Sequence, residues 1–183
     1  HKKEPNVGSF FKNLVLDEES FERLNTRLVN VPFYKELGTV GIDATDIPVI
    51  AFSVGEEELA GLDTGPLVGH LAAWNYFMSS ESEENYAFIE AWHKFIGDDS
   101  RVTNDPMEAH VIGFNMWVKA VENVGTTEVD VVRPAMYGLT VPNLTGGIAV
   151  MNTNHHLTKP VLIGEILDDG QFEIVYETPA GVI

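Results

Sequence analysis

The sequence predicts an α/β fold built around a parallel sheet. Two short, continuously apolar segments at 47–53 and 67–77 have the pattern of buried strands, and helical segments alternate with them. Strands that alternate with helices pair in parallel, because each helix carries the chain back along the sheet. Ligands of such sheets bind beyond the carboxyl ends of the strands, which directs attention to the loops after Ser53, Trp74 and Thr26.

The beginning of the chain has the weakest pattern, and the segment 1–23 receives no assignment. Its apolar run at 10–16 fits either a strand or part of a helix, and a short helix over 17–24 is possible. Residues 31–37 predict a helix that ends at the glycines that follow it. Its apolar side is formed by Phe33, Tyr34 and Leu37.

A third helix is expected to begin after the 47–53 strand, at 55–59. Its first turn contains Glu56, Glu57 and Glu58, which suit the positive end of a helix dipole. Helix electrostatics is the simpler explanation of this acidic run. The alternative is that one of the three carboxylates faces a ligand, because the turn follows the end of a strand.

The middle of the chain predicts three helices. The helix over 82–97 has an apolar stripe, which we expect to pack against a sheet: Tyr86, Ile89, Trp92 and Phe95. A helix from Asp105, its expected N-cap, runs to about residue 123. Its predicted apolar side is Met107, Val111, Phe114, Trp117, Val118 and Val121. Pro134 should end or bend a weaker helix over 129–137.

The last part of the chain predicts strands joined by turns. The segments 147–151, 160–167 and 172–176 have strand patterns. Between the last two, Asp168-Asp169-Gly170 is a hairpin signal, because aspartate followed by glycine favours the tight turns that join antiparallel strands.

Composition excludes several classes of function. The 28 acidic residues exceed the 11 basic ones, and the net charge of −17 repels phosphate backbones and anionic membranes, so no nucleic acid partner is expected. The absence of cysteine excludes disulfides and thiolate chemistry. No segment is long and apolar enough to predict membrane insertion.

No motif predicts catalysis, a metal site or a cofactor. Ser53 lacks the Gly-x-Ser-x-Gly setting of a nucleophile, and the Gly146-Gly147 pair lacks the lysine and helix of a phosphate loop. Glu56 and its neighbours do not have the spacing of a calcium loop, and the adjacent His155 and His156 fit a solvated turn. We therefore expect a protein that is not an enzyme.

A polar–aromatic cluster, Trp74, Asn75 and Tyr76, ends the 67–77 strand. Alternate strand residues share a face, so Trp74 or Tyr76 belongs either to the core or to a cleft. In a cleft, flat rings would exclude water while the amide fixes the orientation of a small polar molecule.

Several segments in consistent order resemble the urea and short-chain-amide binding proteins of ABC transporters. The resemblance covers about residues 24–178 and rests on NVPFYKEL (30–37), IPV (47–49), FSVGEEEL (52–59), GHLAAWNYF (69–77), DPMEA (105–109), NHH (154–156), KPV (159–161) and GQFEIV (170–175).

This resemblance implies the type I periplasmic binding protein fold, in which two α/β lobes joined by three crossings hold a ligand in their cleft. Such proteins have about twice this length, so we expect the C-terminal half. Residues 24–81 would then belong to the second lobe, 82–140 would be helices of the first lobe, and 141–183 would be a β-rich return to the second lobe. The first-lobe sheet would be absent from the sequence.

The expected function is the periplasmic, or otherwise extracytoplasmic, capture of urea or a short amide for ABC permease subunits, without chemistry. The candidate ligand-binding residues are Ser53, Glu56, Trp74, Asn75, Tyr76, Asp105 and Glu108. Their hydroxyl, amide and carboxylate groups suit a small neutral polar solute with N–H donors. Two alternatives are a cytoplasmic amide sensor that regulates a partner protein, and a truncated interaction module.

Overall fold

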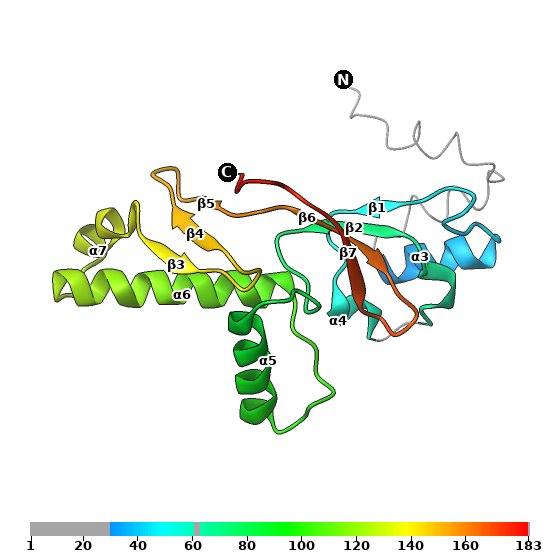
Figure 1. Cartoon of the computed structure of the whole chain (residues 1–183), viewed down its shortest axis with the longest axis horizontal. Helices are drawn as coiled ribbons and strands as arrows, with labels where there is room; N and C mark the ends of the chain where they lie inside the picture. The colour runs from blue at the N-terminus through cyan, green and yellow to red at the C-terminus, as the bar shows by residue number, and fades with distance from the viewer. Residues whose placement is uncertain (1–29, 61–62, 183) are drawn as a thin grey trace, which may run out of the picture.

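The computed structural model describes residues 30–60 and 63–182. The chain forms two parts that lie side by side along its long axis (Figure 1). One part holds a four-stranded sheet with two helices, and the other holds three helices with a three-stranded sheet. The predicted elements at 10–16 and 17–24 and the loop after Thr26 lie outside the described residues.

The four-stranded sheet is mixed and has the order β1-β2-β6-β7. Its strands are β1 (Ile50–Ala51), β2 (Leu71–Trp74), β6 (Leu162–Ile166) and β7 (Phe172–Glu177). As predicted, β1 and β2 are parallel, whereas β2 with β6 and β6 with β7 are antiparallel. The predicted α/β class is confirmed, with antiparallel strands added by the end of the chain.

Both predicted strands of the parallel pair are shorter than expected. Only Ile50–Ala51 of the 47–53 segment pairs with β2. The prediction that this strand is buried is wrong in part, since β1 is an edge of the described sheet and the exposed fractions of Ile50 and Phe52 are 42% and 75%. Pro66 starts a 3₁₀ turn, η1 (Gly65–Leu67), so the 67–77 segment becomes a strand only at Leu71.

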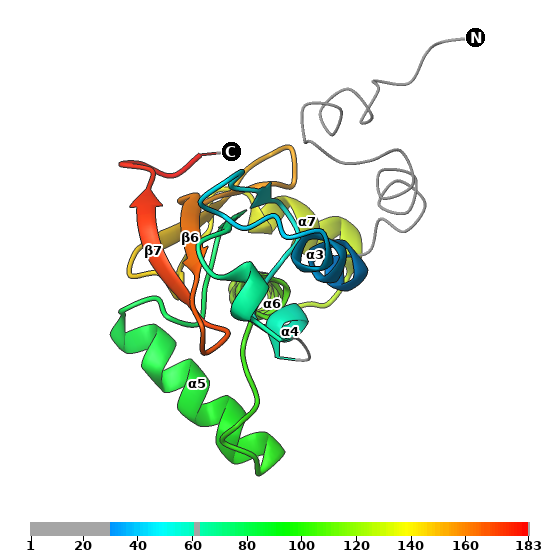
Figure 2. The ribbon, with the colours of Figure 1, turned by 90° about the vertical axis from the view of Figure 1, so that its right-hand side faces the viewer.

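Helices α3 (Asn30–Thr39) and α4 (Glu56–Leu59) cover one face of this sheet. Figure 2 shows them on the side of the molecule away from β7. Their apolar side chains, including the predicted Tyr34 and Leu37, share a core with the sheet. The other fully buried members of that core include Leu59, Ala72, Phe77, Leu162, Ile166 and Phe172.

The hairpin of β6 and β7 has the predicted turn. Gly170 donates a backbone hydrogen bond of 3.2 Å to the Leu167 carbonyl and has a φ of +79°. A left-handed φ favours glycine, which explains why the turn is Asp-Asp-Gly.

The second part contains α5 (Glu83–Ile96), α6 (Asp105–Val124) and α7 (Val129–Met136). An antiparallel sheet of β3 (Thr140–Pro142), β4 (Ile148–Met151) and β5 (Leu157–Thr158) packs on α6. Within the range 141–183, therefore, the strands up to β5 form a sheet of their own, and only β6 and β7 join the four-stranded sheet. The strand β3 is not among the predicted elements.

The caps of the long helices follow from their sequences. The Ser82 hydroxyl accepts the Asn85 N–H at 3.0 Å to begin α5, and the left-handed Gly97 ends it. The N-cap of α6 is Asn104, whose side chain accepts the Met107 N–H at 3.1 Å, so the expectation that Asp105 is the N-cap is wrong by one residue.

Two predictions about helix faces are wrong for the described chain. Helix α6 buries Ile112 and Met116 against the small sheet, whereas Phe114 of its predicted inner side is 63% exposed. The stripe of α5 packs against no described sheet, because Tyr86 and Phe95 are 59% and 85% exposed. Figures 1 and 2 both show α5 projecting from the rest of the molecule.

Candidate functional site

A pocket of about 170 Å³ lies where the carboxyl ends of β1 and β2 meet the beginning of α6. The structure brings together here five of the predicted residues: Ser53, Glu56, Trp74, Tyr76 and Asp105. The remaining lining residues, Gly55, Glu58, Asn104 and Pro106, were not predicted. The pocket therefore occupies the place that the parallel-strand argument indicates.

Glu56 is the most unusual group in this pocket. Its side chain is 1% exposed, and Oε1 accepts the Met78 N–H at 2.5 Å. Its Oε2 has no hydrogen-bond partner within the described part of the chain. Burial raises the pKa of this carboxyl from 4.5 to about 7, more than the Met78 hydrogen bond lowers it. Near neutral pH the group is therefore present in both forms, and its unpaired oxygen accepts a hydrogen bond from a bound molecule when ionised and can donate one when protonated.

The other two acids of α4 have separate contacts. Glu58 Oε2 accepts the Gly55 N–H at 2.8 Å, which closes the first turn of the helix. Glu57 lies at the surface, with its carboxylate 3.4 Å from the guanidinium of Arg101. Arg101 belongs to the connection between α5 and α6. Of the three consecutive glutamates, Glu56 is therefore the one with a buried carboxylate oxygen left unpaired.

The aromatic pair at the end of β2 has both of the expected places, since its residues line the pocket and Tyr76 also belongs to the core. Trp74 Nε1 donates to the Val54 carbonyl at 2.6 Å, which fixes the indole at the pocket wall. Tyr76 is fully buried, and its hydroxyl lies 2.7 Å from both Asn85 Oδ1 and Thr103 Oγ1. Tyr76 therefore lines the pocket with its ring while its hydroxyl is held in the core.

Asp105 and Asn75 hold the two parts of the chain together. Asp105 Oδ2 accepts the Asn75 N–H at 2.9 Å, and Asn75 Nδ2 donates to the Pro160 carbonyl at 2.6 Å. Burial raises the pKa of Asp105, opposed by Lys159 and by the amides of Asn75 and Tyr76. Asp105 lines the pocket, whereas Asn75 is not among its lining residues.

Glu108 lies away from this pocket, inside α6. It is fully buried and forms an ion pair with Lys159, and its Oε1 accepts the Leu144 N–H at 3.5 Å. Burial raises the pKa of Glu108, and the Lys159 charge opposes this. Glu108 contacts the connection between β5 and β6 through Lys159 and does not line the pocket, although it lies one helical turn after Asp105, whose charge also raises the pKa of Glu108.

Two residues with contacts at or near the site were not predicted. Asn104 could have been recognised as the N-cap, because it precedes an Asp-Pro pair that starts a helix. Lys159, which does not line the pocket, could not be paired with Glu108 from the sequence, since the two lie 51 residues apart along the chain.

The lining is rich in hydrogen-bond acceptors. Among the residues that the structure describes, it includes Glu56, Glu58 and Asp105 but no lysine, arginine or histidine. Such a wall suits the N–H groups of a ligand and disfavours a carboxylate directed toward it. Within the residues that the structure describes, no group of three or more His, Asp or Glu side chains is arranged to hold a metal ion.

Comparison with known proteins gives one family for almost the whole chain. The model of the periplasmic binding protein domain matches residues 26–183. Among curated proteins, 110 residues are 32% identical to a limonene hydroxylase of Geobacillus stearothermophilus, covering 60% of this chain and 20% of that protein. In the described residues no helix combines the length and hydropathy of a membrane span.

Solved structures of solute-binding proteins share the fold. One from Rhodopseudomonas palustris HaA2, in complex with p-hydroxybenzoic acid, has a TM-score of 0.71 and 21% identity, and the match covers 83% of this chain and 42% of that one. An amino acid ABC transporter substrate-binding protein from Pseudomonas fluorescens Pf-5 has a TM-score of 0.69 and 16% identity, with coverages of 97% and 49%. The chain thus spans less than half the length of these proteins.

Proposed function

The chain belongs to the periplasmic binding protein domain family. We therefore propose that it acts as part of the extracytoplasmic solute-binding component of an ABC transporter. Its ligand would be held between two lobes without chemical change and then passed to permease subunits. The fold of the neighbouring structures and the pocket at the junction of the two parts support this proposal.

The proposed ligand is urea or a short-chain amide. The observation that carries this proposal is the buried Oε2 of Glu56, an acceptor without a partner among the described residues. Urea and amides offer N–H donors to such an acceptor, and an indole such as that of Trp74 can stack on their planar groups. The small volume of about 170 Å³ suits a ligand of few atoms.

An amino acid is the second candidate ligand. An ionised Glu56 would pair with its ammonium group, and one structural neighbour is named as an amino acid binding protein. Aromatic acids, which other neighbours hold, fit this wall less well because its described residues include no cation. A carboxylate would have to bind on the opposite side of the cleft.

The proposed mechanism is closure of two lobes around the ligand. We assign residues 24–81 together with β6 and β7 to one lobe, and α5 to α7 with β3 to β5 to the other. The pocket is lined from both sides, by Glu56 and Trp74 on one lobe and by Asp105 on the other. A ligand that contacts both sides binds the closed state more tightly and shifts the population toward it.

Isothermal titration calorimetry of the protein, in the longest form that its gene encodes, tests the proposal. We expect binding heat with urea, acetamide or propionamide, and none with 4-hydroxybenzoate. The panel also includes glycine and L-leucine, whose ammonium groups test the second candidate. Absence of heat with urea and with every amide would overturn the proposed ligand class.

The variant Glu56→Gln distinguishes the two candidate ligands, because glutamine keeps an acceptor oxygen and loses the charge. For a neutral amide we expect less than about threefold weaker binding. For an amino acid we expect more than about tenfold weaker binding, since the charge-assisted bond is lost. Glu57→Gln, which changes a neighbouring surface carboxylate outside the pocket, is the matched control.

A further inference from the structure

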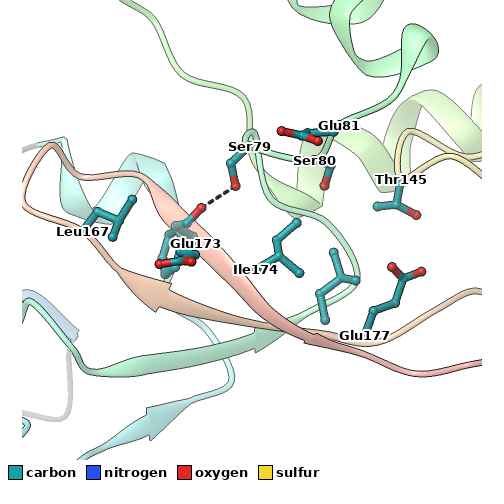
Figure 3. A pocket seen from close by; sticks show the side chains of 10 residues that line it. Ser79, Ser80, Glu81, Thr145, Leu167, Glu173, Ile174 and Glu177 are labelled. Carbon is teal, nitrogen blue, oxygen red and sulfur yellow. Dashed lines mark hydrogen bonds between the residues drawn. The ribbon is translucent and has the colours of Figure 1, made fainter.

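A second, larger cavity of about 510 Å³ lies beside β7, at another place along the junction of the two parts. Its wall comes from the connection between β2 and α5, from the turn between β3 and β4, and from the β6–β7 hairpin (Figure 3). No residue lines both this cavity and the pocket at Glu56. The larger cavity is lined by Ser79, Ser80, Glu81, Thr145, Leu162, Leu167, Phe172, Glu173, Ile174 and Glu177. Its volume lies in the range of small-molecule sites, about 300–1,000 Å³.

The cavity contains a buried hydroxyl that is not satisfied. Ser80 is 2% exposed, and its Oγ has no hydrogen-bond partner among the residues that the structure describes. Figure 3 shows this hydroxyl directed into the cavity, in contrast to that of Ser79, which donates to the Phe172 carbonyl at 2.6 Å. A buried polar atom without a partner costs free energy unless a bound group satisfies it.

The charge of the wall has one sign. Glu81, Glu173 and Glu177 line the cavity, and none of them has an ion pair within the described part of the chain. Figure 3 shows the Glu177 carboxylate pointing toward Thr145, whose hydroxyl donates to Asn143 Oδ1 at 2.9 Å and still has lone pairs to accept with. Leu162, Phe172 and Ile174 supply apolar surface between these groups.

We propose that this cavity binds an organic ammonium ion with an apolar body. The ammonium would donate to Glu177 and to Ser80 Oγ, whereas the apolar body would cover Ile174 and Phe172. An ammonium group has three donors and no acceptor, which matches a wall of carboxylates and hydroxyls. This inference rests on the second cavity alone and is independent of the solute proposed for the Glu56 pocket.

An occupant would contact both parts of the chain, because Thr145 belongs to one part and Glu177 to the other. Two hydrogen bonds tie the segment between β2 and α5 to these two walls: Ser79 Oγ donates to the Phe172 carbonyl of β7 at 2.6 Å, and Ser82 Oγ donates to the Leu144 carbonyl in the β3–β4 turn at 2.7 Å. In this arrangement of the two parts the walls are tied to one segment, which lowers the entropic cost of binding.

Benzylammonium is a suitable probe, followed by ¹H–¹⁵N NMR of the protein. We expect saturable shifts at the amides of Ser80, Thr145 and Ile174, and unchanged amides at Gly55. Benzyl alcohol has the same ring without the charge and should bind at least about tenfold more weakly, and benzoate should not bind. Raising the salt concentration should weaken benzylammonium binding, because the carboxylates are partly screened.

Glu177→Gln should weaken benzylammonium binding about fivefold, and Ser80→Ala should weaken it by a smaller factor. Glu122→Gln removes an exposed carboxylate outside this cavity and should leave the affinity unchanged. Preserved dispersion of the NMR spectrum shows that each variant is folded. Equal binding of benzyl alcohol, shifts confined to the Glu56 pocket, or absence of shifts would each overturn the proposal.

Discussion

At the scale of single residues, the carboxyl group of Glu56 is the feature that the proposed site depends on. It is buried by the fold of the chain, and one of its oxygens has no partner among the described residues. A group of this kind reduces the stability of the folded chain when it is ionised, because its charge is removed from water. Its retention at the pocket wall is consistent with a role in ligand binding rather than in stability.

The variant Glu56→Gln should be more stable than the natural protein at alkaline pH and equally stable at acidic pH. The folded-state pKa is raised from 4.5 to about 7, so the favourable contribution of the protonated carboxyl is complete below about pH 4.5 and is lost as the pH rises through 7. At about pH 8 we expect a gain of up to ~3 kcal/mol for the variant. Thermal unfolding across this pH range measures it, and urea is avoided as denaturant.

Glu57→Gln is the control, since this carboxylate is half-exposed and pairs with Arg101 at the surface. Its effect on the melting temperature should be small at every pH. A difference between Glu56→Gln and the natural protein that does not change with pH would contradict the buried, raised-pKa state of Glu56.

Sequence patterns found much of the pocket because its residues follow strand ends. Ser53, Glu56 and Trp74 lie beyond β1 or at the end of β2, and parallel strands place these ends at one edge. The different roles of Asn75 and Glu108 could not be predicted. Their partners, Pro160 and Lys159, lie 85 and 51 residues away, so only the folded chain brings them together.

At the scale of elements, a buried polar network connects β2 with both long helices. The Tyr76 hydroxyl bonds to Asn85 in the first turn of α5 and to Thr103 just before α6. All three side chains are fully buried. The Asn85 amide in turn donates to the Ser80 carbonyl at 2.7 Å and the Met78 carbonyl at 2.9 Å, which fixes the connection between β2 and α5.

Tyr76→Phe should lower the free energy of unfolding by about 1–3 kcal/mol, because Asn85 Oδ1 and the Thr103 hydroxyl lose a buried partner. Tyr86→Phe makes the same chemical change on the exposed side of α5 and should alter stability by less than about 0.5 kcal/mol. Thermal or guanidinium unfolding of both variants tests this. Equal effects of the two substitutions would show that the network contributes nothing specific.

Helix ends were predicted more accurately than helix faces. Ser82 and Gly97 act through local backbone geometry, which a short stretch of sequence contains. Helix α6 is apolar on two sides, and only the side with Ile112 and Met116 meets the β3–β4 surface. Periodicity cannot choose between two apolar sides when the packing partner lies far along the chain.

At the scale of the whole molecule, the junction of the two parts holds both cavities and several long-range polar contacts. Asn75 bonds to Asp105 and Pro160, and Lys159 bonds to Glu108, so the junction is closely connected. The net charge of −17 fits acceptor-rich pockets that take donors or cations rather than anions. The fold class was predictable because the alternation of elements is strong, whereas the separate small sheet depends on short strands with weak patterns.

The most direct test of the central claim is to locate a bound amide by ¹H–¹⁵N NMR during titration with acetamide. The account predicts saturable shifts at the amides of Gly55, Glu56 and Met78, since Met78 donates to the Glu56 carboxylate. For Glu56→Gln the titration midpoint should rise by less than about threefold, and for Glu57→Gln it should stay the same. Saturable binding that leaves these amides unchanged, or the absence of binding at any acetamide concentration, would contradict it.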